Sequence, residues 1–261
     1  MTVFEGTDPI NGLVVGGGQG IGLGFVQHLL ADDRLPEGWP PIGRIYATYR
    51  TPSANLEALV AQHPERLGLI PMDVTDEAQI AQGIAQLQAQ VGRLHLVLYC
   101  VGFLHEGEIQ PEKSLQQLQA DHLLRYFQVN SIGAVLLAKH ILPLLKHSDR
   151  SVFASISAKV GSIGDNQLGG WYGYRASKAA LNMLMRTVAI EYTRKSPKTT
   201  VVMLHPGTTD TRLSKPFQRN VPSEKLFSVE RTVTQLLKVI EHLRPEDNGQ
   251  FFSWDGSRLP W

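Results

Sequence analysis

Cysteine is almost absent from this sequence, because Cys100 is the only one in 261 residues. One thiol cannot form an internal disulfide, and this scarcity fits the reducing environment of the cytosol. An excess of charge of one sign is also missing, since the formal net charge is +1. This near-neutral charge gives no indication of binding to nucleic acid or to an acidic membrane surface. We also predict no metal site.

Long apolar segments are missing as well. No window holds 18 uninterrupted apolar residues, so we expect no membrane-spanning helix. The first residues, MTVFEGTDPINGLVV, lack a basic segment followed by a long apolar run, so we expect no signal peptide. Together these absences predict a cytoplasmic protein.

The sequence does contain an alternation of short apolar runs with helical stripes. The composition is 43% apolar and 19% charged, which is ordinary for a globular protein with a sizeable core. Strand-like runs occur at 12–15, 44–49, 67–72, 94–100, 151–157, 199–204 and 251–254. Apolar residues recur at helical spacing between them, including about 113–128 and 131–146. This order predicts a single α/β domain over residues 1–261, with a doubly wound, parallel, seven-stranded sheet covered by helices on both faces.

A glycine-rich turn, GGGQGIG, follows the first predicted strand. Gly16, Gly20 and Gly22 have the spacing G-x-x-x-G-x-G, and Gln19 and Ile21 lie between them. Glycine permits a tight turn and a close approach of backbone amides to a pyrophosphate, and the start of a helix adds positive potential. Such turns can also serve packing alone, but the position at the first strand–helix junction favours a dinucleotide site.

The end of the second predicted strand indicates which dinucleotide binds. Arg50 stands there, and the next acidic residue is Glu57. A carboxylate at this place would favour a ribose 2′-hydroxyl, whereas a guanidinium suits the 2′-phosphate of NADP(H). The alternative is a solvated surface arginine. After the third strand, Asp73 and Val74 are placed to meet the adenine edge, although Asp73 could instead cap the next helix.

The stretch GGWYGYRASK contains a tyrosine and a lysine at helical spacing. Tyr174 and Lys178 are four residues apart, which places both side chains on one face of a helix. Tyr172 has Ala176 at the same offset and cannot form such a pair.

Taken together, these motifs make the chain similar to the short-chain dehydrogenase/reductase superfamily, and most similar to its C-factor-like carbonyl reductases. The resemblance covers nearly the whole chain and implies a Rossmann-type fold. Besides the glycine turn, it rests on VNSIG at 129–133, SAKVGSIGDN at 157–166, GGWYGYRASKAALNM at 169–183, HPGTTDTRLSKPF at 205–217 and the terminal DGSRLPW.

The resemblance implies that Tyr174 is the general acid–base, which gives a proton to a carbonyl oxygen as hydride reaches the carbon. A free phenol has a pKa near ~10, so Lys178 is expected to lower the pKa of Tyr174 and also to hold the nicotinamide ribose. Asn130 would anchor a water that links the lysine to solvent. Alternatively, its amide bonds to nearby backbone.

The sequence departs from the family at the serine that holds the substrate oxygen. The family's position, three residues before Gly161, is occupied by Ala158. We expect Ser157 to take this role, because a small bulge at the strand end can re-aim a side chain by one position. Ser162 is the alternative. The family's NNAG is also altered, to YCVG, and here Gly102 is expected to allow the close approach of the cofactor.

The loop after the sixth predicted strand completes the candidate site. By resemblance, its residues lie near the carboxamide and phosphates of the nicotinamide half; they are Pro206, Gly207, Thr209 and Thr211. The nearby histidines, His205 and His105, are expected to be structural. Four aromatic residues could line an apolar substrate pocket or could simply pack: Trp171, Phe217, Trp254 and Trp261.

These residues predict an NADP(H)-dependent carbonyl reductase or alcohol dehydrogenase that acts on a moderately apolar small molecule. The alternative is a dinucleotide-binding regulator with little turnover, which the missing serine would favour. The apolar stripes at 113–128 and 131–146 exceed the needs of one sheet face. We therefore also expect a homodimer or homotetramer.

Overall fold

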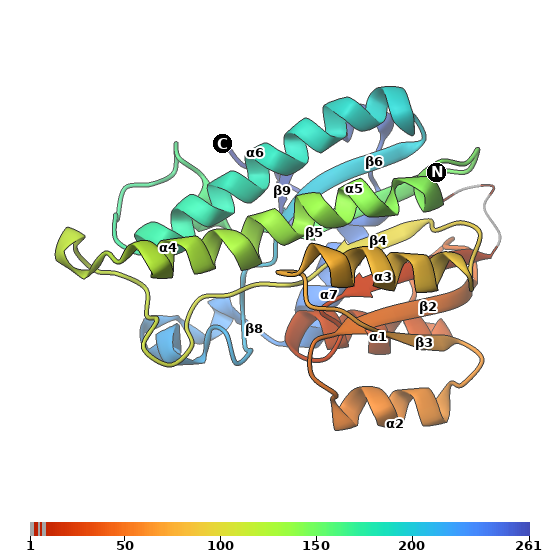
Figure 1. The fold of residues 1–261 in the computed structure, drawn as a ribbon, viewed down its shortest axis with the longest axis horizontal. Helices are drawn as coiled ribbons and strands as arrows, with labels where there is room; N and C mark the ends of the chain where they lie inside the picture. The colour runs from red at the N-terminus through yellow and green to blue at the C-terminus, as the bar shows by residue number, and fades with distance from the viewer. Residues whose placement is uncertain (1–2, 5, 7–8) are drawn as a thin grey trace.

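The computed structural model describes residues 3–4, 6 and 9–261, and its centre is a parallel sheet of seven strands (Figure 1). In spatial order the strands are β3 (Leu67–Pro71), β2 (Ile42–Tyr49), β1 (Ile10–Val15), β4 (Leu96–Tyr99), β5 (Ser151–Ile156), β6 (Thr199–His205) and β9 (Phe251–Ser253). All seven predicted strands are confirmed. The strand order reverses between β1 and β4, and ligands bind at such a crevice in doubly wound sheets.

Helices cover both faces of this sheet, as predicted. One face carries α3 (Glu77–Gln88), α5 (Gly133–Leu145) and α6 (Tyr172–Lys195), and the other carries α1 (Gly20–Leu30), α2 (Ala54–Gln62) and α7 (Val229–Glu241). Each face has its own apolar core. Ile84, Leu137 and Leu181 belong to the first core, and Phe25 and Leu236 belong to the second.

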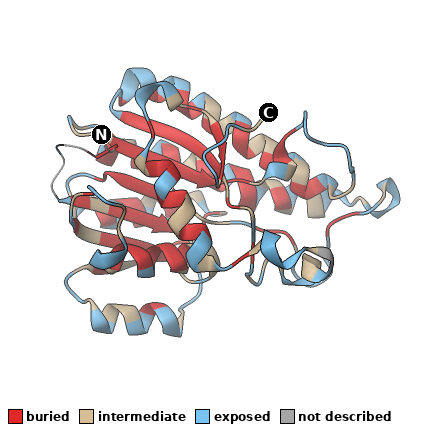
Figure 2. Cartoon of the chain, turned by 180° about the vertical axis from the view of Figure 1, so that it is seen from behind, coloured by how far each residue is buried: buried red, intermediate tan, exposed pale blue. Residues whose placement is uncertain are grey.

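Burial explains why the strand sequences are continuous apolar runs. Every residue of β4 and β5 is buried, because the sheet has protein on both sides. Figure 2 shows the strands as buried and the outer surfaces of the helices as exposed. Helix starts are fixed by local side chains in two cases: Ser228 caps α7, and Asp76 caps α3. The carboxylate that caps α3 is thus that of Asp76, and not that of Asp73.

The segment from 113 to 146 differs from the two predicted helices. Residues 113–119 contain only a short 3₁₀ turn, Leu115–Gln117. The helix begins as α4 (Ala120–Phe127), passes through a π-helical turn (Gln128–Ile132) and continues as α5. The two stripes are therefore parts of one long helix, because the extra residue of the π turn shifts the stripe without ending the helix.

This long helix, Ala120–Leu145, is long and apolar enough to cross a membrane when length and composition alone are considered. Its most apolar window has a mean hydropathy of 1.3, yet 56% of that window is buried inside the protein. Core helices can meet the same criterion, so this feature is weak evidence for a membrane span.

A second, two-stranded sheet was not predicted. It pairs β7 (Thr208–Thr209) with β8 (Leu226–Phe227), and the chain between them contains the 3₁₀ turns Lys215–Asn220 and Ser223–Lys225. This segment follows the carboxyl end of β6, so it projects over the edge of the sheet where the glycine turn also lies.

Candidate functional site

Helix α6 brings Tyr174 and Lys178 to one buried face. Tyr174 is 7% exposed and Lys178 is 2% exposed. The Lys178 Nζ lies 5.9 Å from the centroid of the Tyr174 ring and donates a hydrogen bond to the carbonyl oxygen of Ile156, at 3.0 Å. The end of β5 therefore holds the lysine in place beside the tyrosine.

Burial changes the acidity of both groups. It lowers the pKa of Lys178 to about 8, and it raises the pKa of Tyr174 above the ordinary value. The expected lowering of the Tyr174 pKa is not seen, because desolvation of the phenol dominates in this geometry. Tyr174 is consequently a neutral phenol that can donate a proton.

Asn130 lies in the π turn and joins two elements. Its Oδ1 accepts a hydrogen bond from the backbone N–H of Phe103, at 2.7 Å, and its Nδ2 donates to the carbonyl oxygen of Phe103 and to the Ser177 Oγ, each at 2.9 Å. The Ser177 hydroxyl in turn donates to the carbonyl oxygen of Tyr174. The alternative predicted for Asn130, bonding of its amide to backbone, therefore occurs, and the water-anchoring role stays a prediction.

The glycine turn has the expected geometry. Gly16 and Gly20 have φ values of +81° and +54°, which favour glycine. A Cβ on Gly22 would lie only 2.2 Å from the carbonyl oxygen of Gly16, so this glycine lets α1 start close to the turn. Between them, Gln19 is exposed at the N-cap of α1, and Ile21 packs against the core.

Gly102 and Thr211 complete a cradle opposite the glycine turn. A Cβ on Gly20 would come within 3.4 Å of the Thr211 Cγ2. A Cβ on Gly102 would be 3.5 Å from Leu213 and 3.9 Å from the Lys178 Nζ. The predicted cofactor glycines, Thr211 and the lysine thus come together at one edge of the sheet.

The residues predicted to meet the adenosine half of the cofactor, Arg50, Asp73 and Val74, have other partners in this structure. Arg50 is about half exposed and its guanidinium lies 4.0 Å from the Glu106 carboxylate, which belongs to the loop after β4. Asp73 Oδ1 accepts hydrogen bonds from the backbone and hydroxyl of Thr75. Val74 is buried in the core near α5.

The serines are engaged away from Tyr174. The Ser157 hydroxyl donates to the Asn182 Oδ1, at 2.6 Å, and the Ser162 Oγ accepts from the backbone N–H of Asp165. The pairing of β5 with β6 continues without a register shift as far as Ile156, so no bulge precedes Ser157. Ala158, by contrast, packs in the apolar cluster around Tyr174. A role for Ser157 at the substrate oxygen would require its side chain to rotate.

The loop after β6 lies mainly against α7 and β8. The Thr209 hydroxyl is hydrogen-bonded to that of Thr232, at 2.8 Å. Gly207 has a φ of +73°, and a Cβ there would be 2.6 Å from the Phe227 ring. Pro206, just before it, is buried. Burial lowers the pKa of His205 to about 4, so the imidazole is neutral near pH 7 and fits the predicted structural role.

An aromatic wall covers Tyr174. The Trp171 ring centroid lies 6.2 Å from that of Tyr174 and 4.9 Å from that of Phe217. His105 contacts Phe217 and lies 3.1 Å from the carbonyl oxygen of Leu213. Phe103, Leu104, Tyr126 and Val129 form the floor of the same cluster. Trp254 and Trp261 lie elsewhere, since they pack on Phe227 and Phe251, respectively.

Most of this wall was not predicted from the sequence. Trp171 and Phe217 were recognised only as two of four possible lining residues. Nothing in the sequence indicated that Leu213, Phe103 and Tyr126 belong to this cluster. They come from separate loops and helices, and their spacing in the sequence does not show that they are in contact.

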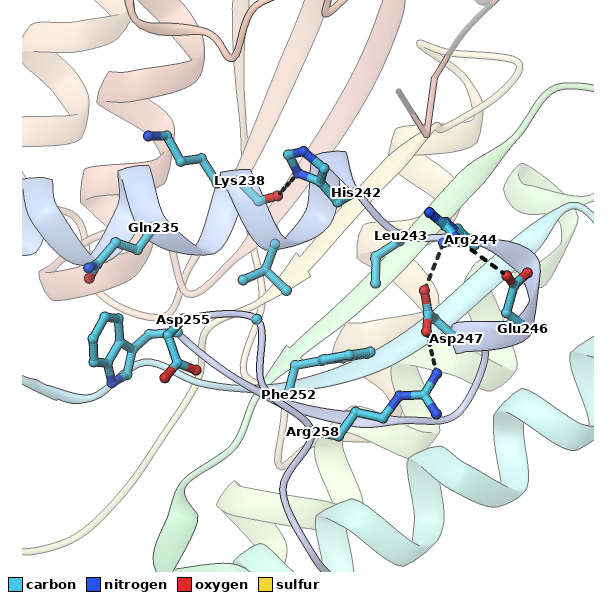
Figure 3. A pocket seen from close by; sticks show the side chains of 13 residues that line it. Gln235, Lys238, His242, Leu243, Arg244, Glu246, Asp247, Phe252, Asp255 and Arg258 are labelled. Atoms are coloured by element: carbon cyan, nitrogen blue, oxygen red, sulfur yellow. Dashed lines mark hydrogen bonds and ion pairs between the residues drawn. The ribbon is translucent and has the colours of Figure 1, made fainter. Parts of the chain in front are cut away.

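A cavity of about 690 Å³ lies outside this site, between α7 and the C-terminal segment (Figure 3). Its rim carries ion pairs between Arg258 and Asp247, at 2.7 Å, and between Arg244 and Glu246, at 3.9 Å. Of the residues named from the sequence, Trp254 lines it, and none of the predicted catalytic or cofactor-binding residues does. Two of its arginines, Arg258 and Arg244, are already paired with carboxylates.

One group of side chains has the composition of a metal site. The potential ligand atoms of His95, His147 and Asp149 lie within 4.8 Å of one another, at the amino end of β4. The His95 Nδ1, however, accepts a hydrogen bond from the backbone N–H of Asn11, at 2.9 Å. A neutral His95 therefore carries its proton on Nε2, the nitrogen that faces Asp149, and cannot use that nitrogen as a ligand. We interpret the group as structural hydrogen bonding.

Comparisons with known proteins identify the family and fold of this chain. A family model described as short chain dehydrogenase matches residues 11–222. The structure of an NADPH-bound carbonyl reductase from chicken fatty liver is 30% identical, with a TM-score of 0.83, over 97% of this chain and 100% of that chain. The C-signal of Myxococcus xanthus is 32% identical over 53% of this chain and 78% of its own length. A benzil reductase ((S)-benzoin forming) of Saccharomyces cerevisiae is 29% identical over 90% and 85%, respectively. The chain therefore belongs to the short-chain dehydrogenase family of oxidoreductases and has a carbonyl reductase-like fold.

Proposed function

We propose that the protein is an NADP(H)-dependent carbonyl reductase or alcohol dehydrogenase. The observation that carries this proposal is the burial of the Tyr174–Lys178 pair beside the glycine turn and Gly102. A proton donor, a cation and a glycine cradle near the crevice where the strand order reverses support this proposal. The NADPH bound by the chicken carbonyl reductase supports the same cofactor here.

The residues present fit a dinucleotide. The positive φ values of Gly16 and Gly20 leave backbone amides without side-chain cover at the start of α1, where a pyrophosphate is stabilised. Arg50 would bind the 2′-phosphate in place of its ion pair with Glu106. Lys178 would hold the nicotinamide ribose, with Gly102 leaving the space for it.

The nicotinamide, when bound, supplies or accepts the hydride. Tyr174 donates its hydroxyl proton to the substrate oxygen, and the Lys178 ammonium stabilises the phenolate that remains. Asn130 is hydrogen-bonded to the Ser177 hydroxyl and to the backbone of Phe103, and it would thereby keep the start of α6 in place against this loop. Ser157 is the hydroxyl proposed to bind the substrate oxygen, after rotation from Asn182.

An aryl ketone or another flat apolar carbonyl compound is the proposed substrate class. Trp171, Phe217 and Leu213 are partly exposed apolar side chains in the cluster around Tyr174, and the buried Phe103 belongs to the same cluster. Aromatic rings favour edge-to-face contacts with one another, at centroid distances of 4.5–7 Å as a rough guide. The similarity to a benzil reductase is consistent with this class.

A homodimer is the proposed assembly. Large apolar side chains are exposed on the long helix, at Leu124 and Ile132, and on the neighbouring α6, at Met183 and Ile190. An isologous dimer would bury both rows. Light scattering tests this: a mass of 28.9 kDa that does not change with concentration would refute it.

The proposed activity is tested with aldehydes, aryl ketones and quinones, by following NADPH consumption optically. Tyr174→Phe should lower turnover by roughly 10²–10⁴-fold, because the proton donor is removed. Tyr172→Phe is the matched control on the same helix and should keep normal turnover, since Tyr172 is partly exposed and faces elsewhere. If NADPH binds but no carbonyl compound is reduced, the regulator becomes the better interpretation.

A further inference from the structure

Glu112 is a buried acidic residue that the proposed mechanism does not use. It lies in the segment between β4 and α4 and is only 2% exposed. Its carboxylate has no cationic partner among the residues that the structure describes, and Oε1 is buried without a hydrogen bond. A buried, incompletely bonded carboxylate destabilises a fold unless other contacts offset it, so its place needs an explanation.

The contacts of Glu112 all lead to the start of α6. Its Oε2 accepts a hydrogen bond from the backbone N–H of Gly173, at 3.1 Å. Its backbone oxygen accepts one from the N–H of Trp171, at 2.5 Å. The N-cap residue, Trp171, makes no capping bond with its own side chain. Glu112 therefore performs the capping from another segment, and its negative charge suits the positive end of the 24-residue helix.

The backbone that Glu112 holds is strained. Trp171 has a φ of +53° and a ψ of 43°, and it is the one residue other than glycine with a positive φ in the described part of the chain. A non-glycine residue in this region is strained and persists only where its surroundings enforce it. The bond from the Trp171 N–H to the backbone oxygen of Glu112 is such a constraint.

Tyr126 packs against the same turn, next to Glu112. A Cβ on Gly173 would lie 2.3 Å from the Tyr126 ring and 3.0 Å from the Glu112 Oε1. The first turn of α6 thus packs against both a carboxylate and an aromatic ring, directly before Tyr174.

We propose that the Glu112 side chain is a positioning group, which fixes the first turn of α6 and thereby aims the Tyr174 hydroxyl at the substrate. The proposal rests on the proposed function of Tyr174. It does not require Glu112 to touch substrate or cofactor. It assigns the effect to the hydrogen bond with Gly173, which an amide oxygen could also accept.

Three variants separate this role from a general loss of stability. Glu112→Ala removes the side-chain hydrogen bond with the Gly173 N–H, and Glu112→Gln keeps an acceptor oxygen for it. Glu108→Ala changes an exposed acid in the same loop and serves as the control. We expect Glu112→Ala to lower kcat by about 10–100-fold, the order expected when a reacting group is misplaced by about 1 Å. The Kd for NADPH should not change, because the glycine turn and Arg50 lie elsewhere. Glu112→Gln should restore most of kcat, and Glu108→Ala should match the unmodified protein.

A second measurement does not depend on turnover. Amide hydrogen exchange at Gly173 and Tyr174 should be faster in Glu112→Ala than in the unmodified protein, and Glu112→Gln should reverse this change. If Glu112→Ala does not fold, Glu112→Asp, whose shorter side chain cannot reach Gly173, takes its place in both assays.

Either of two results overturns the proposal. One is a Glu112→Ala protein with unchanged kcat and unchanged amide exchange; the other is a Glu112→Gln protein whose kcat falls as much as that of Glu112→Ala. A protein that reduces no carbonyl compound even when unmodified would instead refute the proposed function. The exchange data would still decide whether Glu112 holds the turn.

Discussion

Replacing Gly22 with alanine tests whether the close packing of α1 against the glycine turn contributes to the stability of the fold. The added Cβ would lie 2.2 Å from the carbonyl oxygen of Gly16 and 3.3 Å from the Cys100 Cβ. An ordinary carbon–oxygen contact is about 3.3–3.6 Å, so α1 would have to move by about 1 Å. The obstacle is backbone and cannot rotate away. We expect a loss of about 3 kcal/mol in the free energy of unfolding, the upper part of the usual range for overpacking.

Gly18→Ala is the matched control in the same turn. A Cβ at Gly18 would meet nothing closer than 3.7 Å, and its φ is not positive, so alanine should fit. Urea unfolding of both variants measures the stability, and titration of protein fluorescence with NADPH measures the Kd. Gly22→Ala should be destabilised and should bind NADPH more weakly, because the turn is displaced. A Gly22→Ala protein as stable as Gly18→Ala would refute the packing argument.

Three further predictions concern the cofactor, the substrate oxygen and pH. Arg50→Ala should weaken NADPH binding by ~1–3 kcal/mol with little effect on NADH, whereas Glu106→Gln should tighten NADPH binding; equal Kd values for the two cofactors in the unmodified protein would contradict this. Ser157→Ala should lower turnover by roughly 10²–10³-fold at unchanged NADPH affinity while Ser162→Ala is nearly silent, and the reverse pattern would move the role to Ser162. Burial lowers the pKa of His205 to about 4 in the folded protein, whereas in the unfolded chain the same imidazole takes up a proton below pH ~6.5. The unfolded state therefore binds more protons, so the free energy of unfolding should fall by about 2 kcal/mol between pH 7.5 and pH 5. His205→Gln should remove that part of the loss in urea unfolding at the two pH values, and an unchanged pH dependence would show that His205 is not its source.

The parts of the molecule that were predicted from the sequence depend on local patterns. Strand positions follow from apolar runs that are buried on both faces, and the closeness of Tyr174 to Lys178 follows from their spacing on one helix. The glycine turn was recognised because a turn at the first strand–helix junction has a characteristic composition. Each of these inferences needs only neighbouring residues.

The parts that were missed depend on contacts between distant segments. Glu112 lies 61 residues before Gly173, and no spacing rule relates a loop acid to a later helix start. The direction of the Ser157 hydroxyl depends on Asn182, which sits on another element. The cap of α3 is a different case, since Asp73 and Asp76 are both suitable by type and only the observed start of the helix decides between them.

The π turn at Gln128–Ile132 has a consequence for how the long helix tolerates insertions and deletions. Successive residues of an α-helix are rotated by about 100° around its axis, so one residue more or less turns everything beyond it by that angle. The π turn contains one such extra residue but takes it up within a single wider turn, so α4 and α5 keep their faces, and Asn130 within it is bound to Phe103 and Ser177. Deleting a single residue here would leave a regular α-helix with the same buried face, but Asn130 would lose the wide turn from which it bonds these two residues. Homologous sequences that align with a one-residue gap at this point are therefore expected to keep the buried face of the long helix and to lack these contacts.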